Sequence, residues 1–480
     1  MAPIASDDAE LERGLLSGTP TNKSAKRRRL FGPCSATRTA MALIVLLTIL
    51  AAFVYSVFGS PAGSKPLTPT LNVPKEAQLN WAQYSPYFPV DPYRQPPQGC
   101  NVEQVNILQR HGARFPTSGA AARIKSALDK LLAVREFTDH RLDFLRTFQY
   151  DLGTDDLVPF GAAQSFDSGA EVFERYANLV SEKKLPFVRA SSSERVVMSA
   201  LNWTQGFSAS SHHGYNPTLS VILSESSNDT LDDNMCPAAG SSDPQTSLWL
   251  STFAPPITQF LNRGAPHANL TDTDTFNLIS VCPFETVSEE RRSKFCDLFA
   301  TQKGAFPGFA YSGDLDKFYG TGYGQELGPV QGVGYVNELI ARLTGTPVQD
   351  HTQTNHTLDS DPTTFPLNRT IYADFSHDNQ MIAIFSAMGL FRQSHPLNPT
   401  KPDPERDWKA SGMVPFSARM VVERLRCGRI PSVRILVNQQ VQPLEFCGGD
   451  RNGICSLDAF VKSQTFATSD GGGDFEKCFA

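Results

Sequence analysis

One stretch of the chain, residues 39–58, limits what it can fold into more than any other, because its 20 residues include no charged side chain. A helix of that length can cross the hydrocarbon core of a bilayer. Basic residues gather on its N-terminal side, at Lys23, Lys26, Arg27, Arg28, Arg29 and Arg38, whereas the other side has only Lys65 nearby. The positive-inside bias therefore predicts a single-pass type II membrane protein, with most of the chain extracellular or lumenal.

The flanks of this stretch fit the same topology. Because 38 residues precede it, an uncleaved signal anchor is favoured over a cleaved signal peptide, which begins with a short charged region. Residues 1–38 are polar and predict a disordered cytosolic tail. Residues 59–78 are rich in proline and predict an extended stalk, and cleavage of that stalk would release a soluble protein.

Charge and cysteine usage describe the remainder of the chain. Residues 1–38 carry seven Lys/Arg and four Asp/Glu, and the remainder carries 36 and 45. An acidic globular part argues against a nucleic-acid-binding surface, which would be basic. Eight of the nine cysteines follow the apolar stretch, and an even set in a secreted part predicts four disulfides. N-glycosylation sequons at Asn202, Asn228, Asn269, Asn355 and Asn368 lie on the same side.

Two strand–loop–helix units are recognisable in the folded part. A strand over 105–109 leads into His111, and a strand over 370–375 leads into His377. Apolar residues at helical spacing predict a helix after the second strand, ending at Gly389. A third predicted helix covers 332–344. Residues 118–330 mix helical and irregular stretches, which favours an insertion on an α/β framework, where ligands bind at the carboxyl ends of strands.

The stretch RHGARFPT at 110–117 is the most informative for chemistry. Phosphoryl transfer needs an in-line nucleophile and donors for the equatorial oxygens. The imidazole of His111 can attack phosphorus, Gly112 lets the backbone approach closely, and Arg110 and Arg114 offer planar forks for phosphate. A nucleophile and an electrostatic clamp thus come from one short loop.

A proton donor for the leaving alkoxide comes from the second unit. Asp378 follows a strand at the start of a helix, where exposed N–H groups favour an anion, and it can serve as general acid. His377 is a further phosphate donor. Alone, a His-Asp pair is more often an ordinary surface pair, but the first motif fixes five identities in seven positions. His212 and His213 have no third ligand nearby, so no metal site is predicted.

The motif at 110–116 resembles the signature of the histidine acid phosphatases, and the rest resembles their fungal phytase branch. Further similar stretches are QYSPYF at 83–88, FVRAS at 187–191, CPFETV at 282–287, FCDLF at 295–299, QGVGY at 331–335 and DFSHD at 374–378. The resemblance covers roughly 80–480. It implies a histidine acid phosphatase domain over 79–480. That domain is a large α/β sandwich of the histidine phosphatase (phosphoglycerate mutase-like) type with a smaller α-helical domain inserted.

The resemblance also implies roles for individual residues. His111 would become phosphohistidine, Asp378 would be the proton donor, and the phosphate would be bound by Arg110, Arg114, Arg189 and His377. The implied disulfides are Cys100–Cys427, Cys236–Cys478, Cys282–Cys296 and Cys447–Cys455. Neither a cofactor nor a metal is implied, and no oligomeric state is indicated.

Substrate choice is the open question. The implied enzyme is a phosphoric monoester hydrolase of the 3-phytase type, which removes phosphate from phytate (myo-inositol hexakisphosphate). Phytate calls for cations around the pocket, and the candidates for this rim are Arg123, Lys125 and Lys317, with Asp316 as an opposing anion. The alternatives are a broad-specificity acid phosphatase and a catalytically silent, membrane-anchored binding protein. The intact motif residues argue against the silent protein.

Overall fold

The computed structural model describes residues 66–480. The predicted tail (1–38), the predicted membrane anchor (39–58) and the first part of the predicted stalk therefore lie outside the described residues. Among residues 66–480, no helix has the length and apolar character needed to cross a membrane.

A mixed sheet of eight strands forms the centre of the fold, in the order β3-β2-β4-β1-β5-β6-β7, with β8 beside β6. The strands are β1 (Cys100–Arg110), β2 (Phe187–Ser191), β3 (Leu219–Leu223), β4 (Ile371–Ser376), β5 (Arg419–Cys427), β6 (Ile430–Val437), β7 (Gln440–Val441) and β8 (Ile454–Ser456). Strands β3, β2, β4 and β1 run parallel, and the pairs from β1–β5 onward are antiparallel.

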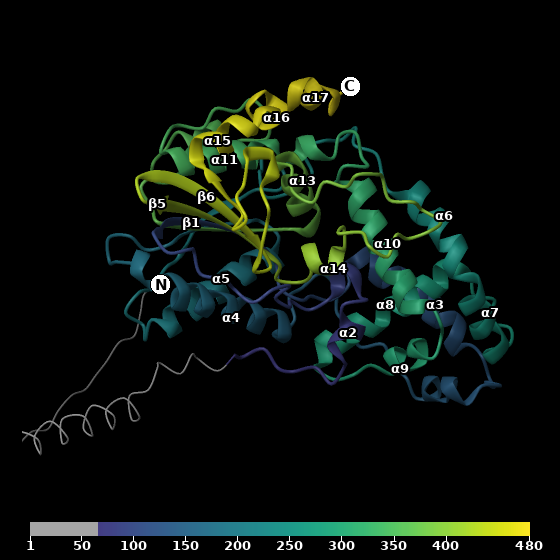
Figure 1. Cartoon of the computed structure of the whole chain (residues 1–480). Coiled ribbons are helices and arrows are strands. Elements are labelled where there is room, and N and C mark those ends of the chain that lie inside the picture. The colour runs from purple at the N-terminus through teal and green to yellow at the C-terminus, as the bar shows by residue number, and fades with distance from the viewer. Residues whose placement is uncertain (1–65) are drawn as a thin grey trace, which may run out of the picture. The chain divides into compact units, whose positions relative to one another are not determined.

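Helices cover both faces of this sheet, which confirms the predicted α/β class (Figure 1). One face packs against α4 (Pro159–Tyr176) and α5 (Glu194–Ser210), through a cluster of apolar side chains that includes Ile107, Trp203 and Phe375. The other face lies under α11 (Val333–Thr344), α13 (Asp378–Met388) and α15 (Leu457–Ser463). The parallel strands β2 and β4 are therefore buried on both faces, whereas the edge strand β3 stays partly exposed.

A second group of helices gathers beside the sheet (Figure 1). It comprises α3 (Ser118–Leu132), α6 (Asp243–Phe253), α7 (Pro255–Gly264), α8 (Asp272–Glu289), α9 (Lys294–Ala300) and α10 (Ala305–Gly320). The segment 118–330 is not all helical, because it also contributes β2 and β3 to the sheet and α4 and α5 to its cover. The short helices are α2 (Lys75–Gln78), α12 (His356–Asp359), α14 (Ala410–Met413), α16 (Thr465–Thr468) and α17 (Asp474–Lys477).

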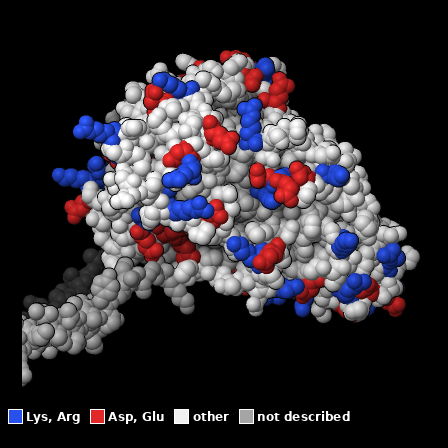
Figure 2. All heavy atoms as spheres, viewed as in Figure 1, with Lys and Arg blue, Asp and Glu red and all other residues white. Residues whose placement is uncertain are grey.

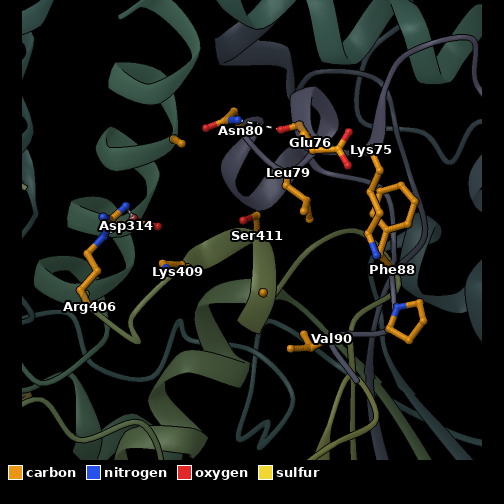
Figure 3. A pocket seen from close by; sticks show the side chains of 13 residues that line it. Lys75, Glu76, Leu79, Asn80, Phe88, Val90, Asp314, Arg406, Lys409 and Ser411 are labelled. Carbon is orange, nitrogen blue, oxygen red and sulfur yellow. Dashed lines mark hydrogen bonds and ion pairs between the residues drawn. The ribbon is translucent and has the colours of Figure 1, made fainter. Parts of the chain in front are cut away.

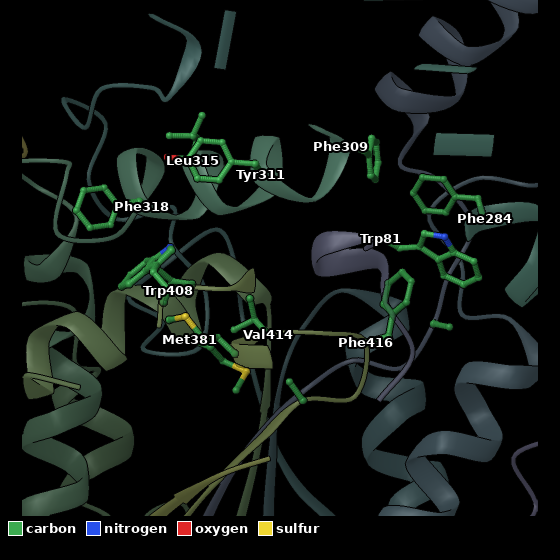
Figure 4. Close-up of a cluster of buried hydrophobic side chains, with 14 of the residues drawn as sticks. Trp81, Phe284, Phe309, Tyr311, Leu315, Phe318, Met381, Trp408, Val414 and Phe416 are labelled. Carbon is green, nitrogen blue, oxygen red and sulfur yellow. The ribbon is translucent and has the colours of Figure 1, made fainter. Parts of the chain in front are cut away.

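Aromatic side chains join the helical group to the sheet (Figure 4). Trp81 and Trp408 are fully buried, and the rings of Tyr84 and Phe284 lie 4.6 Å apart. Aromatic residues bury large apolar areas and so dominate core packing. The helical group thus shares a continuous apolar core with the sheet rather than standing apart from it.

Helix ends follow the sequence signals closely. The predicted helix over 332–344 is α11, and Gly345 caps it with a φ of 72°. Helix α13 ends at Gly389 with a φ of 90°. Glycine adopts this left-handed conformation without the steric cost that a Cβ imposes. Both predictions are confirmed.

The folded part begins earlier than the sequence suggested. Leu71 and Val73, which fall within the predicted stalk (59–78), are buried in the core. The backbone N–H groups of Leu67 and Thr68 donate to the carboxylate of Asp167 at 2.7 and 2.8 Å. Proline content pointed to an extended linker, but two apolar residues at a spacing of two anchor this segment on the domain.

All four disulfides implied by the family resemblance are present: Cys100–Cys427, Cys236–Cys478, Cys282–Cys296 and Cys447–Cys455. Cys100 and Cys427 lie directly opposite each other on β1 and β5. The Cys236–Cys478 bridge fixes the C-terminal helix to the segment that follows β3. The framework restricts the unfolded chain, which is the main way disulfides stabilise.

Candidate active site

The site lies where three parallel strands end at one edge of the sheet. In the register of β1 and β4, Arg110 pairs with Ser376, so the next residues, His111 and His377, leave the sheet side by side. Their ring centroids are 5.7 Å apart. Strand β2 lies on the other side of β4 and leads into α5, which brings Arg195 to the same edge. Such an edge is where α/β proteins bind ligands.

The imidazole of His111 is held so that one nitrogen is free. Its Nδ1 lies 2.8 Å from the carbonyl oxygen of Gly112, and an Nδ1–H donating there leaves the Nε2 lone pair open. The backbone N–H of His111 donates to Ser376 at 3.1 Å, and its carbonyl accepts from Ser417 at 2.9 Å. A Cβ on Gly112 would lie 2.2 Å from the carbonyl oxygen of Gly161, so only glycine fits beside the imidazole.

Electrostatics keep this imidazole neutral. Burial is the largest cause that lowers the pKa of His111 well below its ordinary value, and Arg110, Arg114, Arg195 and His377 lower it further. Burial of the ring and neighbouring positive charges both oppose protonation. A neutral imidazole is the nucleophilic form, and the lowered pKa extends this form to more acidic pH than in an exposed histidine.

Buried guanidinium groups around His111 have unsatisfied N–H donors. Arg110 is fully buried, its Nη1 donates to the carbonyls of Val414 (2.9 Å) and Gln83, and its Cζ lies 4.7 Å from the Phe416 ring centroid. The Nε groups of Arg110, Arg114 and Arg195 are buried without hydrogen-bond partners, and Nη2 of Arg110 has only an ion pair with Asp378 at 3.4 Å. Leaving such donors unpaired is costly, so they indicate a place for an anion with several acceptor oxygens.

Arg195 takes the place that the sequence prediction gave to Arg189. Arg189 is 1% exposed, and its guanidinium is paired with Asp374 at 2.7 Å and Glu338 at 2.5 Å. Its position opposite Asp374 in the β2–β4 register directs it to that pair, so its prediction as a phosphate ligand is wrong. Arg195, in the first turn of α5, has its Nη2 3.4 Å from His377 Nδ1. The sequence signal that could have identified Arg195 is its position, a basic residue shortly after a strand that ends at the site.

His377 and Asp378 open helix α13, as predicted. His377 is the N-cap residue, and its Nε2 lies 3.0 Å from Oε1 of Glu225. Oδ2 of Asp378 lies 3.4 Å from Arg110 Nη2 and 2.9 Å from Lys317 Nζ. Burial alone would raise the pKa of Asp378, but Arg110 and Lys317 outweigh it and hold the pKa well below its ordinary value. Asp378 is therefore ionised when the site is free.

Lys317 lies inside the site rather than on its rim. It is 4% exposed, and its Nζ contacts Asn379 Oδ1 at 2.6 Å and Asp316 Oδ2 at 3.1 Å. Of the other predicted rim residues, Arg123 lines a hollow together with Asp316 and Tyr84. Lys125 is exposed on α3, and its Nζ lies 5.4 Å from the ring centroid of Tyr150. Only Arg123 thus faces the hollow beside Asp316.

Possible metal ligands meet at one place within 66–480. Glu225, Asp232 and His377 each offer one atom, and these atoms lie within 4.8 Å of one another. The group includes neither His212 nor His213. The Glu225–His377 contact already pairs two of the three, so the geometry is explained without an ion.

A separate hollow lies away from this chemistry, lined by residues of α2 and α14 and their neighbours (Figure 3). Lys75, Phe88, Arg406 and Lys409 lie around it, but none of the residues that surround His111 does. Its Arg406 is already paired with Asp314 at 2.5 Å. The hollow is therefore not part of the site.

The strand-end loops, the free imidazole and the ring of cations define a phosphoryl-transfer site on an α/β fold. A family model described as histidine phosphatase superfamily (branch 2) matches residues 101–438. The chain belongs to this superfamily.

Relatives and solved structures agree with this assignment. Phytase A of Arthroderma benhamiae is 42% identical over 418 residues, covering 82% of this chain and 91% of the relative. Phytase A of Aspergillus fumigatus is 39% identical over 424 residues, covering 83% and 90%. The crystal structure of the phytase from D. castellii matches the fold with a TM-score of 0.68 at 21% identity, covering 82% of this chain and 85% of that one.

A multiple inositol polyphosphate phosphatase from Bifidobacterium longum, in complex with inositol hexasulfate, has the same fold. It matches with a TM-score of 0.58 at 14% identity and covers 79% of this chain and 96% of that one.

Proposed function

We propose that the chain hydrolyses phosphomonoesters, phytate among them, through a phosphohistidine at His111. The observation that carries this proposal is the open Nε2 of a neutral imidazole, surrounded by buried guanidinium groups with unpaired N–H donors. The high identity to proteins named Phytase A over most of the chain supports phytate as a substrate.

In the first step, Arg110, Arg114 and Arg195, with His377, bind the nonbridging oxygens of the phosphoryl group. Nε2 of His111 forms a bond to phosphorus as the bond to the leaving oxygen breaks. Preorganised cations stabilise the charge on the equatorial oxygens without reorganising during the reaction. The leaving alkoxide takes a proton from Asp378.

Asp378 must gain that proton in the presence of substrate, because it is ionised in the free site. A bound phosphate shares the field of Arg110 and Lys317, the two cations that depress its pKa. The added negative charge then raises the pKa of Asp378 toward the acidic working range. In the second step, Asp378 takes a proton from water, the oxygen attacks phosphorus, and the phosphorus–nitrogen bond to His111 breaks. Inorganic phosphate leaves.

A second candidate activity, broad acid phosphatase, has one observation in its favour. The hollows beside the site are lined by Asp233, Asp243 and Asp316 as well as by Arg123. Figure 2 shows Lys/Arg interspersed with Asp/Glu on the face drawn, rather than gathered into a single basic patch. A polyanion such as phytate gains less binding energy from a pocket lined by both signs of charge than from a purely basic one.

The experiment compares phosphate release from phytate and from an aryl phosphate across the acid and neutral range, with His111→Ala as the control. A preference for phytate supports the first assignment, and equal rates support the broad phosphatase. Phosphate release that survives His111→Ala would refute the phosphohistidine mechanism for either substrate.

The location of the enzyme is part of the proposal. Residues 39–58 would anchor it as a type II membrane protein with the catalytic domain extracellular or lumenal, and stalk cleavage would release it. The test is alkaline extraction of membranes, from which an anchored chain does not dissolve.

Glycosylation is proposed first at the exposed Asn269 and Asn368, and next at Asn228, which is exposed but whose amide donates to the carbonyl of Thr354 at 3.1 Å. The amide of Asn202 donates to Met198 O at 2.8 Å, and that of Asn355 accepts from Leu358 N–H. Mass spectrometry after glycosidase treatment identifies which sites are occupied.

A further inference from the structure

The mechanism above assigns no role to Glu225, which follows β3 and lies beside His377. Its Oε1 lies 3.0 Å from His377 Nε2. The same carboxylate accepts from the Ser191 hydroxyl at 2.8 Å, the Ser193 N–H at 2.9 Å and the Ser193 hydroxyl at 2.7 Å. A half-buried carboxylate with four donors has a fixed position and orientation.

These contacts connect the three segments that carry the phosphate-binding groups. Ser191 ends β2 and Ser193 caps α5, whose second residue is Arg195. His377 begins α13. The carboxylate of Glu225 therefore fixes two groups relative to each other. One is the turn that carries Arg195, and the other is the imidazole of His377. Nη2 of Arg195 and Nδ1 of His377 are consequently 3.4 Å apart.

The chemistry of the contact defines what it does for His377. A carboxylate at Nε2 accepts the hydrogen bond of that nitrogen and thereby fixes the orientation of the ring, as in other carboxylate–histidine pairs. The other ring nitrogen, Nδ1, then faces the side where Arg195 lies. The other groups around the ring are Asp232, at 3.7 Å from Nε2, and His111. Asp232 is beyond hydrogen-bonding distance, so Glu225 is the partner that fixes the ring.

We propose that Glu225 is a positioning residue, which orients His377 and the Arg195 turn so that both donate to the same phosphate. This inference rests on the proposed function, because it assigns phosphate to these two side chains. Glu225 would not touch phosphate or the reacting atoms. Hydrogen bonds from His377 and Ser193 outweigh the effect of burial and hold the pKa of Glu225 well below its ordinary value, so the carboxylate is charged throughout the working range.

Orthophosphate binding, measured by calorimetry on the whole protein, tests this inference without requiring turnover. Glu225→Gln keeps the size of the side chain but removes the charged acceptor that holds Nε2 of His377. We expect phosphate to bind at least about tenfold more weakly, the effect of losing one hydrogen bond to a charged group. The matched control is Asp229→Asn, because Asp229 also accepts from the Ser191 hydroxyl, at 2.8 Å, but does not contact His377. The control should change phosphate binding by less than about threefold.

A double-mutant cycle separates positioning from a general effect on folding. In a His377→Ala background, Glu225→Gln should weaken phosphate binding clearly less than in the wild type, because one of the two groups it orients is gone and only the Arg195 turn remains. In the enzyme assay, Glu225→Gln should raise KM more than it lowers kcat, and Glu225→Asp should restore part of the loss.

Equal phosphate binding by the wild type and Glu225→Gln would overturn the inference. An undiminished Glu225→Gln effect in the His377→Ala background would overturn it as well, and melting temperatures recorded in parallel identify a folding defect. Failure of the proposed function has a different signature. In that case the wild type would bind orthophosphate with the expected dependence on Glu225 but would release none from any ester.

Discussion

Replacing Lys317 tests how neighbouring cations set the pKa of Asp378, the proposed general acid. Its Nζ lies 2.9 Å from Oδ2 of Asp378, and the two side chains are 5% and 15% exposed. Solvent therefore screens the pair little. Lys317→Met removes the cation and keeps the length of the side chain. Asp316 also loses its partner, because its carboxylate lies 3.1 Å from Lys317 Nζ in the wild type. Its negative charge near Asp378 is then no longer compensated by Lys317.

The size of the effect follows from the contact. A hydrogen bond to a charged group contributes about 1.5–3 kcal/mol, and 1.36 kcal/mol corresponds to one pKa unit, so the pKa of Asp378 should rise by about 1–2 units. The Coulomb energy at 2.9 Å is larger, about 6 kcal/mol at an effective dielectric constant of 20, but it is an upper bound. The direction is upward because the lost cation favoured the charged form.

The assay is the pH dependence of kcat, which reports groups in the enzyme–substrate complex. Activity requires protonated Asp378, so the alkaline limb of the profile should move to higher pH by about 1–2 units in Lys317→Met. KM should rise, because a cation beside the phosphate is lost. Lys462→Met is the matched control, since Lys462 forms an exposed pair with Asp458. An alkaline limb that stays in place would refute the assignment of Asp378 as the acid.

Three further substitutions probe the site and its support. Arg195→Ala should weaken orthophosphate binding about tenfold or more in calorimetry while leaving the melting temperature nearly unchanged. Arg189→Met should instead lower the free energy of unfolding by about 3–5 kcal/mol in urea titrations, because it strands buried carboxylates. Gly112→Ala should destabilise by at least about 1–3 kcal/mol in the same titrations, since its Cβ would clash with Gly161. Comparable effects of the two arginine variants on phosphate binding would contradict these roles.

The parts of the fold that could be predicted from the sequence were those with local signals. The strands before His111 and His377, the helix after Asp378 and the glycine caps at 345 and 389 all depend on residues close in the chain. The disulfide pairing came from the family resemblance and is confirmed. Long-range pairing is not encoded locally, so the positions of β2 and β3 in the sheet could not be read from segment 118–330.

The errors at the site have the same origin. Arg189 and Arg195 lie six residues apart in a basic, serine-rich stretch, and only the β2–β4 register shows that the first meets Asp374. Lys317 was predicted on the rim of the pocket, but α10 buries it against Asp378. Leu71 and Val73 were masked by the prolines around them. Each case depends on a tertiary partner far away in the sequence.

The central claim is that His111 carries the phosphoryl group between the two steps. Rapid quenching of the wild type with radiolabelled substrate should trap protein-bound phosphate that is labile in acid and stable in base, as expected of a phosphoramidate. The label should be absent from His111→Ala. It should accumulate in Asp378→Asn with an aryl phosphate, because that leaving group does not need the proton of Asp378 and only the second step is then slowed. Hydrolysis by the wild type with no trapped label under any quench, or label that persists in His111→Ala, would contradict the account.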